Sequence, residues 1–160
     1  MAGRIRTDEP SIAPADEAAA ASYDRDFYSW TQEQARLVRA GQWARVDREN
    51  VAEEIESLGR TEFNKLESAL RIILLHMLKW DHQPARRSRS WALSISQQRL
   101  ELDDVLADNP GLRPRIDDAI ARAYRKARLQ AMQQTNLNET QFPVACPYSW
   151  DDLVSREFSR

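Results

Sequence analysis

Turn-forming residues are scarce in this chain, and their scarcity most limits what it can fold into. Only four glycines and seven prolines occur among 160 residues. The stretch between Gly41 and Gly59 contains neither residue type, and the stretch from Arg60 to Gln83 contains none either. Strands joined by hairpins need turns rich in Gly or Asn-Gly. The sequence therefore predicts an all-α fold.

Apolar residues recur at intervals of three and four, the spacing that places them on one face of an α-helix. This pattern predicts a bundle of four to five main helices with a short C-terminal helix. The third helix is apolar over most of its circumference, so we expect it to be the most central. The predicted helices span residues 24–40, 47–58, 61–81, 88–108, 114–134 and 149–154, with the second ending at Gly59.

Residue types suited to helix ends lie at the predicted boundaries. Asp47, Ser88 or Ser90, and Ser149 can cap helix N-termini, and Gly41 suits a left-handed C-terminal cap. The apolar stripes also predict which side chains are buried. These are Phe27, Trp30, Val51, Leu66, Leu70, Ile73, Leu74, Met77, Trp91, Ile95 and Ile120.

Composition divides the chain and limits its location. Residues 1–22 are rich in Ala, Pro and acids without periodicity, which predicts a mobile tail before a single helical domain over 23–160. No apolar run is long enough to cross a membrane. A single cysteine, Cys146, and the lack of a secretory signal indicate the cytoplasm. The net charge of −2 does not indicate nucleic-acid binding through bulk charge.

The predicted second helix carries the densest set of polar groups. Asp47, Asn50 and Glu54 lie within about 60° of one another on a helical wheel, at the edge of its apolar face. A buried carboxylate needs a partner, and for Glu54 we expect Arg86, Arg89 or Arg99. The favoured interpretation is a polar network that fixes helix register. The alternative is an acid–base or metal site that involves His76.

A second group of polar residues is basic. Arg86, Arg87, Arg89 and Arg99 lie in a segment without acids, with Ser88 and Ser90 at a predicted helix start. Arginine forks and free backbone N–H groups could bind a phosphate, a nucleic-acid backbone or the acidic patch of a protein partner. The alternative is internal, with these arginines neutralising the acids of the second helix. The number of positive charges in this segment roughly matches the number of negative charges in the second helix, which favours the internal interpretation.

Arg71 and His76 have the Arg-x4-His spacing found in a superfamily of helical ribonucleases, named for prokaryotic and eukaryotic nucleotide-binding helical domains. The resemblance implies that the pair acts on an RNA phosphodiester at a dimer interface. Two features depart from that pattern. The residue after the arginine is Ile72 rather than a polar residue, and the pair lies about 140° apart on an ideal helix. The favoured interpretation of His76 is a hydrogen-bonded histidine at the core boundary.

Five longer segments together resemble a bacterial family, domain of unknown function 29. They occur in the family's order and cover roughly residues 23–153. The resemblance implies an all-α domain of bacterial origin and no established activity. The segments are YDRDFYSWTQEQARLVRAG, VDRENVAEEIESLGR, HMLKWDHQPARRSRSW, SQQRLELDDVLADNPGLRP and FPVACPYSWDDL.

Motifs of common enzymes and metal sites do not occur in the sequence. There is no Glu-x-x-His pair, no Gly-rich phosphate loop and no Gly-x-Ser-x-Gly elbow. We therefore expect no cofactor and no metal. The best hypothesis is a non-catalytic cytoplasmic interaction or regulatory module that binds a protein partner or a second copy of the chain. The alternative is a ribonuclease, or another phosphodiester-processing enzyme, that uses Arg71 and His76.

Overall fold

The computed structural model describes residues 22–159, and all regular structure in this range is helical. This confirms the predicted all-α fold with a short C-terminal helix. No described helix is both long enough and apolar enough to cross a membrane. Except for Ser22, the predicted mobile tail lies outside the described residues. The helices are α1 (Phe27–Arg39), α2 (Arg48–His82), α3 (Arg89–Asp108), α4 (Ile116–Thr135) and α5 (Trp150–Ser155).

The chain divides into two compact units, with the boundary after Ile55. The described part of the first unit is residues 22–55, and that of the second is residues 56–159. The single domain expected over 23–160 stays a prediction.

In the first unit, α1 is held by a cap at each end. The carboxylate of Asp26 accepts a hydrogen bond from the backbone N–H of Ser29 at 3.0 Å. Gly41 follows the helix with φ +67°, the left-handed conformation predicted for it. The rings of Tyr23 and Trp30 meet edge to face with their centroids 4.9 Å apart. Trp30 is thereby buried, as predicted.

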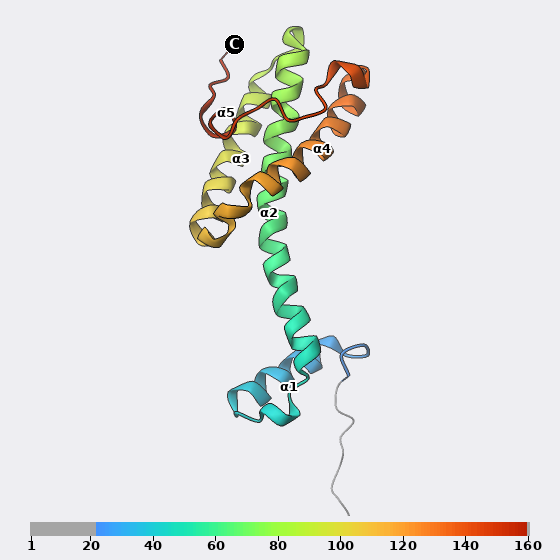
Figure 1. Ribbon diagram of the computed structural model, residues 1–160, viewed down its shortest axis with the longest axis vertical. Helices are drawn as coiled ribbons and strands as arrows, with labels where there is room; N and C mark the ends of the chain where they lie inside the picture. Colours follow the sequence, from blue (N-terminus) through green and yellow to red (C-terminus); the bar gives the residue numbers. More distant parts are fainter. Residues whose placement is uncertain (1–21, 160) are drawn as a thin grey trace, which may run out of the picture. The chain divides into compact units, whose positions relative to one another are not determined.

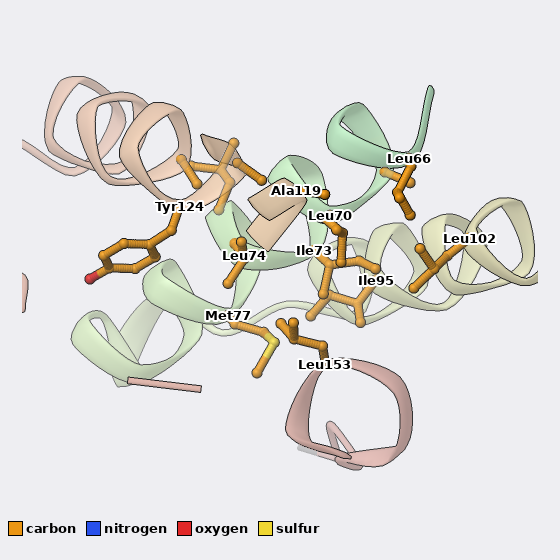
Figure 2. Packing of buried hydrophobic residues seen from close by; sticks show 14 of the residues in the cluster. Leu66, Leu70, Ile73, Leu74, Met77, Ile95, Leu102, Ala119, Tyr124 and Leu153 are labelled. Carbon is orange, nitrogen blue, oxygen red and sulfur yellow. The ribbon is translucent and has the colours of Figure 1, made fainter. Parts of the chain in front are cut away.

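In the second unit, the core forms around the C-terminal part of α2 (Figure 1). The stripe predicted for this segment is fully buried and faces Ile95 and Leu102 of α3 and Leu153 of α5 (Figure 2). Small residues on α4 are also fully buried, which lets this helix approach the core closely. The buried stripe of α2 includes Leu66, Leu70, Ile73, Leu74 and Met77, and the small residues of α4 are Ala119, Ala123, Ala127 and Ala131.

The prediction of two helices over residues 47–58 and 61–81 is wrong. A single helix, α2, continues through Gly59 and Thr61 for 35 residues. A glycine in a helix interior costs only about 1 kcal/mol relative to alanine. The next proline, Pro84, comes only after the end of α2, so nothing near Gly59 adds to this cost and the helix continues.

Part of the predicted core is not buried. Phe27 is 48% exposed. Ile55 and Leu58, which follow Val51 at intervals of four and three residues, are 63% and 68% exposed. Helical spacing shows which side chains share a face, but it does not show whether another element covers that face. Three further residues of the predicted core, Val51, Trp91 and Ile120, are only half-buried.

Candidate functional site

Asp47 is the centre of a polar cluster in the first unit. Its carboxylate accepts hydrogen bonds from the backbone N–H of Asn50 at 3.4 Å and from the Asn50 side-chain amide at 2.7 Å. The indole N–H of Trp30 donates to the same carboxylate at 3.3 Å. The side-chain oxygen of Gln34 accepts from the backbone N–H of Asp47 at 2.8 Å. Asp47 therefore caps α2, as predicted, and ties this helix to α1.

Glu54 receives its hydrogen bond from a tyrosine that no sequence pattern connects with it. The hydroxyl of Tyr23 donates to Glu54 Oε1 at 2.5 Å. This bond, together with the nearby carboxylate charge, raises the pKa of Tyr23 to about 12, so the phenol stays protonated. The expected pairing of Glu54 with Arg86, Arg89 or Arg99 would join the two units and stays a prediction.

The Asp47 cluster lines a hollow of about 420 Å³ in the first unit. The side-chain amide of Asn50 lowers the pKa of Asp47, so this carboxylate is ionised at neutral pH. An ionised carboxylate that caps a helix is a poor proton donor. Among residues 22–159, no three His, Cys, Asp or Glu side chains gather as the ligands of a metal ion would.

Arg71 links two helices of the second unit. Its guanidinium donates to Gln130 Oε1 of α4 at 2.7 Å and lies 3.5 Å from the hydroxyl of Ser68. Both the arginine and the glutamine are only partly exposed. Arg71 therefore cross-links α2 to α4, a role that its spacing from His76 did not predict.

His76 lies five residues after Arg71 on α2 and is partly buried at the edge of the core. Its Nδ1 atom is buried and has no hydrogen-bond partner within the described part of the chain. The prediction that His76 is hydrogen-bonded is therefore wrong for Nδ1. Burial, assisted by the positive charge of Lys79, lowers the pKa of His76 to about 4. The imidazole is therefore neutral at pH 7.

The basic segment divides into two kinds of residue. Arg87 donates to the backbone carbonyl of Trp80 at 2.9 Å. Arg99 donates to the carbonyls of Leu153 at 2.7 Å and Asp152 at 3.0 Å, next to the end of α5. Arg87 and Arg99 are thus tied to backbone oxygens of their own unit. The other two arginines of the segment, Arg86 and Arg89, are exposed.

The serines of the same segment have a structural role in helix α3. The hydroxyl of Ser88 caps α3 by accepting from the backbone N–H of Trp91 at 3.4 Å. The hydroxyl of Ser90 lies 3.0 Å from that of Ser88. The predicted cap is therefore present. Because the Ser88 hydroxyl already accepts this backbone hydrogen bond, it is less available to an anion at the start of α3.

Asp81, which the sequence analysis did not single out, anchors the C-terminal segment to the end of α2. The hydroxyl of Tyr148 donates to Oδ2 of Asp81 at 2.9 Å, and Arg156 donates to both carboxylate oxygens at 3.0 and 2.5 Å. Burial alone would raise the pKa of Asp81, but these hydrogen bonds outweigh it and hold the pKa below its usual range. Burial, with the charge of Asp81, raises the pKa of Tyr148.

Two of the distinctive sequence strings meet at this junction, which gives them a structural explanation. Asp81 belongs to HMLKWDHQPARRSRSW, and Tyr148 belongs to FPVACPYSWDDL. One indication of this contact was present in the sequence, namely that Asp81 and Tyr148 both occur in strings of unusual composition.

Comparison with known proteins supports the resemblance found in the sequence. A family model described as "Domain of unknown function DUF29" matches residues 22–159. The match includes every residue of the sites described above. No curated protein and no solved structure matches the chain.

Proposed function

The chain belongs to the DUF29 family, and from the geometry of its own residues we propose that it is a non-catalytic interaction module of the bacterial cytoplasm. The observation that carries this proposal is the bond between Arg71 and Gln130. It places the guanidinium of the best catalytic candidate in a cross-link between two helices. The cytoplasm is proposed because the one cysteine of the sequence cannot form an internal disulfide.

The state of His76 also argues against catalysis by this pair. A general acid at neutral pH must carry a proton that it can give up, and an efficient general base has a pKa near the working pH. With a pKa of about 4, His76 is unprotonated at pH 7 and is a weak base. The buried Nδ1 atom is not available to a substrate.

Exposed aromatic side chains in the first unit support a role in binding. Tyr28 is 73% exposed, Trp43 is 63% exposed and Phe27 is 48% exposed. Large apolar side chains in water gain free energy when a partner covers them, and Trp and Tyr are the residue types most enriched at the centres of protein interfaces. The partner is proposed to be a protein or a second copy of this chain. The net charge of −2 gives no bulk attraction to nucleic acid.

Capture of a partner from the native cell tests this proposal. The full chain carrying Tyr28→Ser and Trp43→Ser is compared with the wild type and with Leu129→Ser, a control at a 55% exposed apolar position of the second unit. We expect the double variant to retain at least tenfold less partner than the wild type, and the control to retain the wild-type amount. Sedimentation of the purified chain detects self-association through the same side chains. Equal retention and equal sedimentation for the wild type and the double variant would contradict the proposal.

A further inference from the structure

The second unit contains a hollow of about 280 Å³ that has no part in the proposed interaction through the first unit. Three arginines line it, and none of its lining residues is acidic. The hollow lies beside the 3₁₀ turn Pro110–Arg115, which precedes α4. Its lining residues are Gly59, Arg60, Phe63 and Asn64 of α2, Leu112 and Arg115 of the turn, and Arg122 of α4.

Two of the arginines lie against one aromatic ring. The guanidinium of Arg115 is 4.7 Å from the ring centroid of Phe63, and that of Arg122 is 5.3 Å from it. The two guanidinium groups are therefore within about 10 Å of each other and repel, since charges of one sign do so at this separation. A bound anion would relieve this repulsion.

Nearby carboxylates leave part of this positive charge free. Arg60 is 3.6 Å from Glu56, and Arg122 is 3.8 Å from Glu67. Both distances are too long for hydrogen bonds. The pair of Arg60 and Glu56 is exposed on both sides, and such pairs contribute little to stability, whereas the carboxylate near Arg122 is buried.

The buried carboxylate of Glu67 is bound instead by Lys126. Arg115, by contrast, donates a hydrogen bond to the carboxylate of Asp118 at 2.7 Å. Within the described part of the chain, the guanidinium groups of Arg60 and Arg122 have no hydrogen-bond acceptor. Their N–H groups are therefore available to a ligand.

Gly59 leaves the backbone of α2 open on the side of this hollow. Glycine destabilises a helix interior relative to alanine, yet Gly59 lies within α2. A Cβ atom at this position would meet no atom within 4 Å, so packing does not require a glycine here. Because Gly59 lines the hollow, its missing side chain keeps the helix backbone open to an occupant.

We propose that this hollow binds a phosphate dianion through Arg60, Arg115 and Arg122, with Gly59 leaving room for its oxygens. The planar fork of a guanidinium matches phosphate oxygens and makes charge-assisted hydrogen bonds to them. The guanidinium groups of Arg115 and Arg122 both pack against the ring of Phe63, so this ring helps to orient them. The phosphate belongs either to free inorganic phosphate or to a phosphoserine side chain of a protein partner.

Calorimetric titration of the full chain tests the arginines. Inorganic phosphate, a short phosphoserine peptide and its unphosphorylated form are titrated at constant ionic strength. We expect both phosphate probes to bind, and Arg122→Gln to weaken them at least tenfold, while Arg113→Gln, an exposed arginine outside the hollow, has no effect. Tighter binding of the phosphopeptide than of inorganic phosphate assigns the site to a partner, and equal binding assigns it to the free anion. Binding of neither probe, or equal weakening by the two variants, would overturn the proposal.

Gly59→Ala provides a test in which loss of folding cannot explain the result. Alanine favours the helix, so we expect the Tm to rise by about 2–4 °C. The added methyl group narrows the hollow, so the affinity for inorganic phosphate should fall several-fold in the same variant. If Gly59 has no role in binding, the Tm of the variant rises but its affinity for phosphate stays unchanged. That result would contradict the role proposed for Gly59.

Discussion

Replacement of Leu70 by alanine is expected to lower the free energy of unfolding by about 2–5 kcal/mol. Leu70 is fully buried at the centre of the stripe on α2, where residues of α3, α4 and α5 meet (Figure 2). Truncation removes apolar contacts and leaves a cavity that the three neighbouring helices cannot close without moving. Urea denaturation followed by circular dichroism at 222 nm measures the change.

Leu100→Ala is the matched control for this prediction. Leu100 is the same residue type in α3, but its side chain is 68% exposed. Substitutions at such positions usually change stability by no more than about 0.5 kcal/mol. If Leu70→Ala cost no more than Leu100→Ala, the second unit would not be held together by the core described above.

Acidification is expected to destabilise the protein through His76. The folded state holds the pKa of His76 at about 4, against 6.5 for the free side chain. Between these two values the unfolded chain binds more protons than the folded one, so stability is lost as the pH falls from about 6.5 toward 4. A shift of this size contributes about 2 kcal/mol between pH 7 and pH 4.5, after allowance for the part of the ring that water reaches.

The pH dependence of His76→Gln isolates this contribution. Glutamine does not titrate, so the variant should lose about 2 kcal/mol less stability than the wild type when the pH falls from 7 to 4.5. Urea denaturation at both pH values gives the four free energies. Parallel losses in the two proteins would mean that His76 is accessible to protons in the folded state.

Local sequence signals predicted three helix N-termini and the centre of the core. Asp47, Ser88 and Ser149 accept the backbone hydrogen bonds expected of N-caps, because a short polar side chain satisfies the first N–H groups of a helix wherever tertiary packing permits. The apolar stripe of α2 that includes Leu70 and Ile73 is buried because residues of α3, α4 and α5 pack against it. The prediction that a helix ends at Gly59 was wrong, because a glycine ends a helix only when the residues after it also disfavour a helix.

The candidate sites were harder to predict because their partners are distant in sequence. Glu54 was expected to need a partner, but Tyr23 precedes it by 31 residues and lies before the first helix. The bond between Arg71 and Gln130 joins residues 59 positions apart. Helical spacing identifies neighbours on one helix, whereas these contacts depend on how separate segments fold against each other.

The hollow lined by Arg60, Arg115 and Arg122 was also hard to predict, because its residues come from separate segments of the chain. Arg115 lies in the turn before α4 and Arg122 lies within α4, and no motif in the sequence connects either residue with Phe63 or Gly59. The structure brings these two arginines to Phe63 and Gly59 of α2. The one local signal was a glycine inside a run of good helix formers, and its meaning depended on the space around it.

Incubation of the purified full chain with total RNA is the most direct test of a non-catalytic role. The wild type is compared with His76→Ala and Arg71→Gln, with and without added Mg²⁺ or Mn²⁺, after circular dichroism has confirmed that all three are folded. The expected result is RNA of unchanged length in every sample, equal to a buffer control. Cleavage by the wild type that both variants lose would contradict the non-catalytic role and would assign Arg71 and His76 to a ribonuclease site.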